Sequence, residues 1–200
     1  MLRTLALSAA LILALSGHAD AGHNGVNDRP FLSLVGSVEG PDGYDTITLA
    51  TRLQPSKPLT SMSIEEVLAF QRKVRSSGAN SSAMGRYQFN YRTLSHIVET
   101  RGIDTSLRFD RFTQDALARM EMQRCGFYDA GATKTSVANC LAAVWAALPL
   151  ASGPRRGQSR YAGVAGNRSL VTVEEFLDSL SGRFPGQVQM ASGAGRAPRD

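Results

Sequence analysis

Residues 135–148 read TSVANCLAAVWAAL, and a proline follows at position 149. Apolar side chains occupy nearly every side of a helix drawn through this stretch, among them Val137, Leu141 and Val144. A helix that is apolar nearly all round is buried within a domain. Pro149 is a natural end for it, because proline lacks the backbone N–H donor that a continuing helix needs. We therefore predict one central buried helix over Thr135–Leu148, with the other helices packed around it.

Five other segments carry helix signals. The clearest are two capping boxes, in which Ser63 precedes Glu66 and Thr172 precedes Glu175 by three residues. The predicted helices cover residues 28–39, 63–74, 90–101, 112–125 and 172–180. A strand-like pattern over Tyr44–Leu49 adds a small β-hairpin or sheet after the first helix. The predicted fold class is therefore α+β, mainly helical.

The N-terminal residues have the pattern of a secretory signal peptide over residues 1–21. Arg3 gives a positive start, Leu5–Leu15 is an apolar run too short to cross a bilayer, and Ala19-Asp20-Ala21 matches a small-residue cleavage site. We expect cleavage near Ala21, which would place the mature protein in the periplasm or outside the cell. No other stretch is long and apolar enough to predict a membrane span.

The remaining chain is long enough for one domain with its own core. We predict that this domain covers residues 22–182 and that residues 183–200, rich in Gly, Ala, Pro and Ser, form a disordered tail. The formal net charge of +5 comes mainly from arginines scattered along the chain. Nucleic-acid-binding proteins more often gather basic residues in a run with interleaved aromatics. The charge therefore favours an anionic polymer such as the cell wall over a nucleic-acid partner.

The chain has two cysteines, Cys125 and Cys140. In an oxidising compartment they would form one disulfide, whose loop of about 15 residues contributes roughly 3 kcal/mol of stability in the chain-entropy model. The alternative is a pair of buried thiols, because Cys140 falls on the apolar helix. We favour the disulfide.

Histidines are too few for several classes of enzyme. Beyond the predicted signal peptide the chain holds only His23 and His96. A zinc peptidase needs several ligands at suitable spacing, and a serine or cysteine nucleophile usually needs a histidine partner. We interpret His96, within a predicted helix, as a structural or surface residue. The sequence therefore predicts no metal and no cofactor, and it leaves carboxylates for acid–base chemistry.

Glu39 has the most informative setting of the carboxylates. It lies four residues after Val35, beside the apolar stripe of the predicted helix 28–39, which Asp28 can cap. It also occupies the last helical turn, where backbone carbonyls carry partial negative charge. Both placements disfavour the ionised form and should raise the pKa of Glu39, as a general acid near neutral pH requires. The plainer alternative is a solvated glutamate at a helix end.

The loop Ser81–Phe89 reads SSAMGRYQF. Its small side chains leave the backbone uncovered, so that a chain-like substrate could lie against it. Tyr87 and Gln88 add an aromatic face for stacking and an amide for hydrogen bonds to sugar hydroxyls. Taken alone, the segment could also be an ordinary structural turn.

Five short segments of the chain have to be considered together, in the order in which they occur. They are FLSL at 31–34 leading into Glu39-Gly40, GYDTI at 43–47, GRYQ at 85–88, QDAL at 114–117 and CLAAVWAALP at 140–149. In this order they resemble the lambda-type phage endolysins, which are lytic transglycosylases of lysozyme-like fold. The resemblance covers about residues 30–182. It implies a lysozyme-like domain whose small β-hairpin or sheet lies near the active site.

The resemblance also implies roles for individual residues. Glu39 corresponds to the catalytic glutamate, and Tyr44, Arg86, Tyr87 and Gln88 correspond to residues that bind the glycan substrate. The chain departs from the phage enzymes in a shorter connection after the catalytic residue and in the helical segment that follows it. Substrate contacts from those regions are therefore not carried over.

The predicted signal peptide makes the chain similar to exported bacterial muramidase-like proteins that accompany secretion or flagellar machinery. The expected partners are peptidoglycan glycan strands and, through this similarity, an envelope-spanning apparatus. We expect the protein to act as a monomer.

The expected reaction is cleavage of the β-1,4 bond between N-acetylmuramic acid and N-acetylglucosamine in peptidoglycan. In a lytic transglycosylase, Glu39 alone serves as acid and base, and the product is a 1,6-anhydro sugar. A hydrolytic muramidase would need a second carboxylate, as a nucleophile at about 5 Å or a base at about 6.5–9.5 Å. Asp42 and Asp45 are the candidates, although both also suit turn formation. A non-catalytic peptidoglycan-binding protein is the alternative outside the enzyme class.

Overall fold

The computed structural model describes residues 25–164 and 166–185. The predicted signal peptide and the part of the predicted tail beyond residue 185 lie outside the described residues. The described chain is mainly helical, as predicted. Its α-helices are α1 (Arg29–Glu39), α2 (Ile64–Ser76), α3 (Tyr91–Arg101), α4 (Arg111–Arg124), α5 (Lys134–Val144) and α6 (Val173–Ser179). Two short 3-10 helices, η2 (Gly43–Asp45) and η3 (Leu59–Ser61), lie between α1 and α2.

Local side-chain signals set the starts of several helices. Both predicted capping boxes form, with Ser63 and Thr172 each accepting the backbone N–H of the glutamate three residues further on. Asp28 precedes α1 but makes no side-chain cap. Its carboxylate accepts hydrogen bonds from Arg119 Nε at 2.8 Å and from the Tyr128 hydroxyl at 2.7 Å. The cap predicted at Asp28 is therefore wrong, because these partners take the carboxylate.

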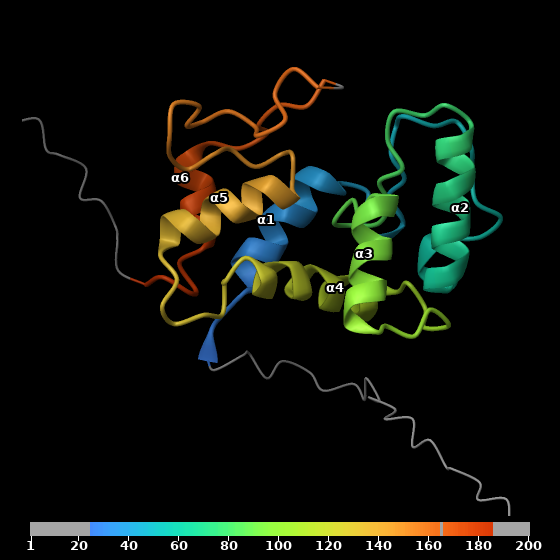
Figure 1. The fold of residues 1–200 in the computed structure, drawn as a ribbon, viewed down its shortest axis with the longest axis horizontal. Helices are drawn as coiled ribbons and strands as arrows, with labels where there is room; N and C mark the ends of the chain where they lie inside the picture. Colours follow the sequence, from blue (N-terminus) through green and yellow to red (C-terminus); the bar gives the residue numbers. More distant parts are fainter. Residues whose placement is uncertain (1–24, 165, 186–200) are drawn as a thin grey trace, which may run out of the picture.

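The helices form two groups, with α4 running between them (Figure 1). At one end α1 and α5 both pack on α6, and at the other end α2 packs on α3. Helix α4 packs on α5. Figure 1 shows that the C-terminal end of α1 points toward the space between the two groups.

The core around α1 is built on the fully buried ring of Phe31. Its centroid lies 6.0 Å from that of Phe127, 5.6 Å from that of Trp145 and 6.2 Å from that of Phe176. Aromatic pairs at such distances contribute about 0.5–1.5 kcal/mol each beyond the burial of their area. Trp145 is only 2% exposed, so it is a core residue.

Helix α5 ends at Val144, four residues before the end predicted from the sequence. Trp145 leaves the helix with extended dihedral angles, φ −112° and ψ 114°. Its indole N–H donates to the Tyr87 carbonyl at 3.0 Å, and the backbone N–H of Ala147 donates to the Glu39 carboxyl group. Contacts with distant segments therefore replace the last helical turn. Only one face of α5 is buried, formed by Val137, Ala138, Leu141 and Ala142. The prediction of a central helix buried nearly all round is therefore wrong, because α5 packs mainly on α4 and α6 and leaves Thr135 and Ser136 exposed.

The predicted β-hairpin or sheet is absent from the described residues, where pairing is limited to isolated bridges such as Ile47 with Met84. The first part of the predicted strand Tyr44–Leu49 forms η2 instead. The Thr46 hydroxyl closes this turn by donating to the Gly43 carbonyl at 2.7 Å. One backbone pair cannot build a ladder, so the described fold is helical without a sheet.

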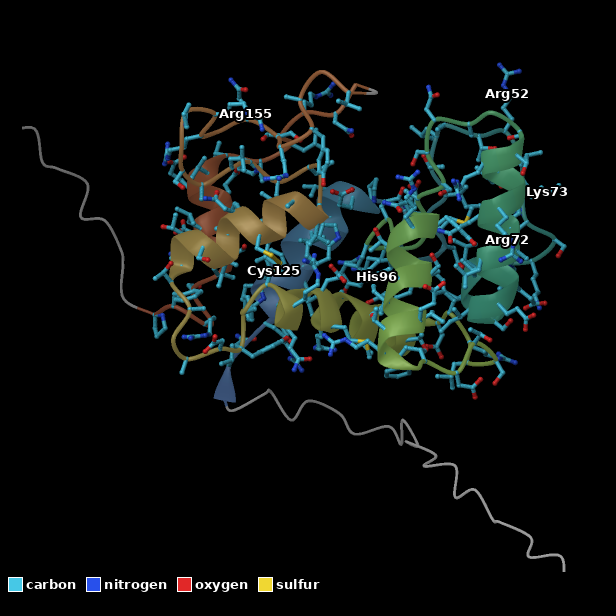
Figure 2. The ribbon with its side chains drawn as sticks, viewed as in Figure 1. Arg52, Arg72, Lys73, His96, Cys125 and Arg155 are labelled. Carbon is cyan, nitrogen blue, oxygen red and sulfur yellow. A yellow bond between two sulfur atoms is a disulfide. The ribbon has the colours of Figure 1, made fainter. Side chains whose placement is uncertain are left out.

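Cys125 and Cys140 form a disulfide, with Cα atoms 5.4 Å apart. It joins the end of α4 to α5, as the position of Cys125 in Figure 2 shows. The described fold therefore contains the bridge rather than the alternative of two buried thiols. His96 lies exposed on α3, in agreement with its interpretation as a structural or surface residue.

The folded part extends slightly beyond residue 182, where the predicted domain ends. The Arg183 guanidinium donates to the carbonyls of Phe127 at 2.9 Å and Asp129 at 2.7 Å. Within the two described ranges, no helix combines the length and hydropathy that crossing a membrane requires.

Candidate active site

Glu39 is the last residue of α1, and its side chain is partly buried. Its Oε1 accepts a hydrogen bond from the backbone N–H of Ala147 at 3.0 Å. Burial raises the pKa of the Glu39 carboxyl group above its ordinary value, and the Ala147 hydrogen bond opposes part of this rise. The direction agrees with the sequence-based expectation, and burial is its main cause.

The Ala147 N–H also distinguishes the two oxygens of the Glu39 carboxyl group. Because a backbone N–H can only donate, Oε1 must accept in both protonation states. Because the carbonyl oxygen of a neutral carboxyl group is the stronger acceptor, this hydrogen bond favours the proton on Oε2. When the proton leaves, the same N–H stabilises the carboxylate that forms. The group can thus donate a proton from one defined atom and take a proton back.

Gly36 of α1 and Gly40, which directly follows the helix, allow the segment around Arg86 to lie against the end of α1. A Cβ atom at Gly40 would lie 2.5 Å from the Arg86 carbonyl oxygen and 2.7 Å from its Cα. A Cβ atom at Gly36 would meet the Arg86 guanidinium group. That group also lies over the Tyr44 ring, with Cζ 5.4 Å from the ring centroid. The end of α1 and the Ser81–Phe89 loop, the two segments that the sequence analysis singled out, therefore lie against each other next to Glu39.

The Arg86 segment is a tight turn closed by reciprocal hydrogen bonds between the backbones of Met84 and Phe89, at 3.1 and 3.0 Å. Gly85 has a φ of +80°, a region that favours glycine, and Gln88 has a φ of +46°. The Gln88 amide nitrogen donates to the Gly85 carbonyl at 2.9 Å. This nitrogen, predicted to bind sugar hydroxyls, is therefore engaged in closing its own turn.

Gln114 of α4 is fully buried, and its side chain holds the Arg86 turn in place through hydrogen bonds. Its Oε1 accepts the backbone N–H of Arg86 at 2.8 Å. Its Nε2 donates to the carbonyls of Tyr44 at 2.9 Å and Phe109 at 2.8 Å. One side chain thus satisfies three backbone groups from three segments, and it holds the Arg86 turn and η2 in a fixed relation.

Tyr44 and Tyr87 are brought together by Asp115 of α4. Both hydroxyls donate to Asp115 Oδ1, at 2.9 Å from Tyr44 and 2.7 Å from Tyr87. Burial and then the hydrogen bond to Asp115 raise the pKa of both phenols. Tyr87 is only 2% exposed, so the stacking face predicted for it is not available in this structure. Its inward ring supports the turn, while Tyr44 is partly exposed.

The two candidate second carboxylates lie on the exposed connection after α1. Asp45 accepts hydrogen bonds from Thr60, from the backbone N–H at 2.8 Å and from the hydroxyl at 3.2 Å. It therefore ties η2 to η3. Asp42 is exposed at the start of η2 and makes no side-chain cap there. Both positions fit the turn-forming interpretation.

Three contributors to the site were not identified as functional from the sequence. Gln114 and Asp115 belong to one of the five segments that carry the resemblance, so their position was signalled but their role was not. Ala147 contributes only its backbone N–H, which no side-chain pattern could reveal. Among the described residues, no group of three or more His, Cys, Asp or Glu side chains is arranged to hold a metal ion.

Comparison with known proteins does not assign the chain to a family. No family model, no curated protein and no solved structure matches it. The geometry around Glu39 is therefore the basis for the chemistry of this site.

Proposed function

We propose that the protein is a peptidoglycan-cleaving glycosidase, a lytic transglycosylase acting on the β-1,4 bond between N-acetylmuramic acid and N-acetylglucosamine. Glu39 carries this proposal, because burial raises its pKa while the side chain stays partly accessible. A carboxyl group with a raised pKa keeps its proton to a higher pH than an ordinary glutamate, and the protonated form is the one that can protonate a glycosidic oxygen. The glycan would lie against the Arg86 turn, which approaches Gly40 next to Glu39, and against Tyr44, whose ring lies under the Arg86 guanidinium.

The reaction needs one carboxyl group used twice. Glu39 Oε2 donates its proton to the glycosidic oxygen as the bond from the muramic C1 to that oxygen breaks. The C6 hydroxyl oxygen of the same muramic acid then bonds to C1, and its proton passes to Glu39. The acid is thereby regenerated and the product is a 1,6-anhydro ring. Between the two proton transfers, the Ala147 N–H stabilises the ionised carboxylate.

The other carboxylates of this region support a mechanism with a single glutamate. A hydrolase needs a second carboxylate that is available as nucleophile or base. Asp45 is engaged with Thr60, and Asp115 accepts two tyrosine hydroxyls. Asp42 is exposed and makes no side-chain cap, so it is the carboxylate whose role the Asp42→Asn variant has to decide. We prefer transglycosylation to hydrolysis because it needs Glu39 alone and because it is the reaction that the resemblance implies. The predicted export signal would deliver the enzyme to the periplasm or the outside, where peptidoglycan lies, for local remodelling of the cell wall around an envelope-spanning apparatus.

Digestion of purified sacculi tests the proposal. The mature protein should release anhydro-muropeptides, which mass spectrometry separates from hydrolysed products because they are lighter by one water. Glu39→Gln keeps the shape of the side chain but supplies no proton, so it should still bind sacculi and lose cleavage by at least about a hundredfold. Asp42→Asn and Asp45→Asn are the controls and should retain cleavage.

Each other outcome points to a defined alternative. Hydrated reducing ends together with loss of activity in Asp42→Asn or Asp45→Asn would indicate a hydrolytic muramidase. Binding of sacculi without cleavage by the unaltered protein would indicate a non-catalytic peptidoglycan-binding protein. Full activity of Glu39→Gln would remove the catalytic assignment.

A further inference from the structure

A small hollow lies between the end of α2 and the start of α3, away from Glu39. It has a volume of about 270 Å³, and its lining includes Arg75, Asn80, Ser82, Tyr91 and Arg92. Its size suits a small group such as one or two amino-acid residues rather than a folded partner. No aspartate or glutamate belongs to its lining. The hollow therefore combines two guanidinium groups with neutral hydrogen-bonding groups.

The walls of this hollow are fixed by contacts on several sides. The Arg75 guanidinium lies over the Tyr91 ring, with Cζ 4.9 Å from the centroid. The buried Ser82 hydroxyl accepts the backbone N–H of Tyr91 at 3.1 Å. Gln71 of α2, fully buried, donates to the Ser82 carbonyl at 2.9 Å. The polar wall is thus held in place before any ligand arrives, which reduces the entropic cost of binding.

The hollow is continuous along the chain with the candidate active site. Ser82 lines the hollow, and Arg86, four residues later, lies against Gly40. Four residues of extended chain span at most about 14 Å. Ser82, in the lining of the hollow, therefore lies within this distance of Arg86, which approaches Gly40 next to Glu39.

We propose that the hollow binds a carboxylate of the short peptide that peptidoglycan carries on its muramic acid residues. This rests on the proposed function, which brings such a peptide to the same loop. Guanidinium groups form charge-assisted hydrogen bonds with carboxylates, and two of them without a neighbouring acid select an anion. Peptide-bearing glycan is then bound more tightly than glycan from which the peptides have been removed.

A matched pair of double variants tests the hollow, each in the Glu39→Gln background so that no substrate is consumed. Arg75→Gln with Arg92→Gln removes the two lining charges. Arg72→Gln with Arg101→Gln removes two exposed arginines of the same helices that do not line the hollow, and Figure 2 places Arg72 on α2. Both pairs change the net charge equally. Circular dichroism confirms that each variant folds.

Affinity for peptide-bearing and for peptide-free glycan chains is measured by titration calorimetry. The hollow variant should bind peptide-bearing chains about tenfold more weakly than the parent, and the control pair should bind them like the parent. Neither pair should alter binding of peptide-free chains. Equal weakening of binding by both pairs would mean that only the net charge matters, which would overturn the proposal. The proposal would also be overturned if the parent protein bound peptide-bearing and peptide-free chains equally well.

A second probe reads the hollow independently of any glycan cleavage. A synthetic dipeptide of alanine and glutamate is titrated into the isotope-labelled Glu39→Gln protein. Amide signals of residues 80–82 and 90–92 should shift, and the shifts should disappear in the hollow variant but not in the control pair. Unchanged spectra would overturn the peptide site even if Glu39 proves catalytic. Conversely, if the unaltered protein does not cleave sacculi, the proposed glycosidase function is wrong, whether or not the dipeptide binds.

Discussion

The carboxyl group of Glu39 and the backbone N–H of Ala147 are 108 positions apart in the chain and 3.0 Å apart in space. The bond links the end of α1 to the turn that follows α5. That segment also contains Trp145, whose indole N–H binds the carbonyl of Tyr87 in the Arg86 turn. One short stretch of backbone therefore positions both the proposed acid and the surface beside it. Because the fold sets the pKa of this carboxyl group, the stability of the fold must in turn depend on whether Glu39 is protonated.

Glu39→Gln is expected to stabilise the protein at neutral and alkaline pH. Because burial raises the folded-state pKa of Glu39 above the ordinary 4.5, ionisation costs folding stability. The contribution of Glu39 is fully present below about pH 4.5 and is lost as the pH rises through the folded-state pKa. The neutral glutamine lacks this loss, so the gain in melting temperature should be larger at about pH 8 than at about pH 4. Each unit of raised pKa corresponds to about 1.4 kcal/mol.

Thermal unfolding across this pH range, followed by circular dichroism, measures the effect. Glu99→Gln removes the same charge from an exposed position on α3 and serves as the control. Its melting temperature should follow that of the unaltered protein at every pH. A Glu39→Gln variant that gains nothing at alkaline pH would show that the carboxyl group is solvated after all.

Gly40→Ala is expected to displace the Arg86 turn from α1. The φ of Gly40 is −127°, which alanine can adopt, so the effect would come only from the collision of the new Cβ with the Arg86 backbone. Such overpacking costs about 1–3 kcal/mol, and the catalytic efficiency should fall with the displaced surface. Gly36→Ala meets the movable end of the Arg86 side chain, and the higher helix propensity of alanine offsets part of its cost.

Denaturant unfolding and sacculus digestion of the two glycine variants are compared side by side. Gly40→Ala should be the less stable and the less active. Equal behaviour of the two variants would mean that the turn can shift away from α1 without consequence for the site.

Gln114→Met is expected to destabilise the protein by about 3 kcal/mol or more. Methionine fills a similar volume but leaves the Arg86 N–H and the carbonyls of Tyr44 and Phe109 without their partner. Each unsatisfied buried group costs about 1–3 kcal/mol. Gln123→Met, on the exposed side of α4, should change stability by less than about 0.5 kcal/mol. Urea denaturation gives both values, and a small loss for Gln114→Met would show that water replaces its hydrogen bonds.

The features that the sequence predicted correctly depend on neighbouring residues. The capping boxes at Ser63 and Thr172 form because both partners lie three positions apart, within one helical turn. The partial burial of Glu39 follows in the same way from the apolar stripe that includes Val35. The position of Trp145 in the core follows from the apolar surroundings on its own segment. Short-range patterns therefore sufficed where the structure is decided locally.

The errors concern contacts between distant segments. The Asp28 carboxylate matched a helix cap, but Arg119 and Tyr128, about a hundred positions away, bind it instead. Tyr87 stands between two polar residues in a small-residue loop, which gave no sign that Asp115 would hold its hydroxyl inward. The strand pattern over Tyr44–Leu49 lacked a partner long enough to form a ladder. Tertiary hydrogen bonds decided the first two cases, and the lack of a neighbouring strand decided the third.

Tyr44→Phe and Tyr87→Phe are expected to be coupled through Asp115, because both hydroxyls donate to the same carboxylate oxygen. Tyr87→Phe should cost more, about 1.5–3 kcal/mol, since its hydroxyl lies on a buried ring and binds a charged partner. Tyr44→Phe should cost about 0.5–1.5 kcal/mol, because that ring is partly exposed. Either remaining hydroxyl can still satisfy Asp115, whereas the double variant leaves it with neither. The double variant should therefore lose at least about 0.5 kcal/mol more than the sum of the single losses. A double-mutant cycle by denaturant unfolding measures this excess, and strict additivity would mean that the two tyrosines contribute to the Arg86 turn independently.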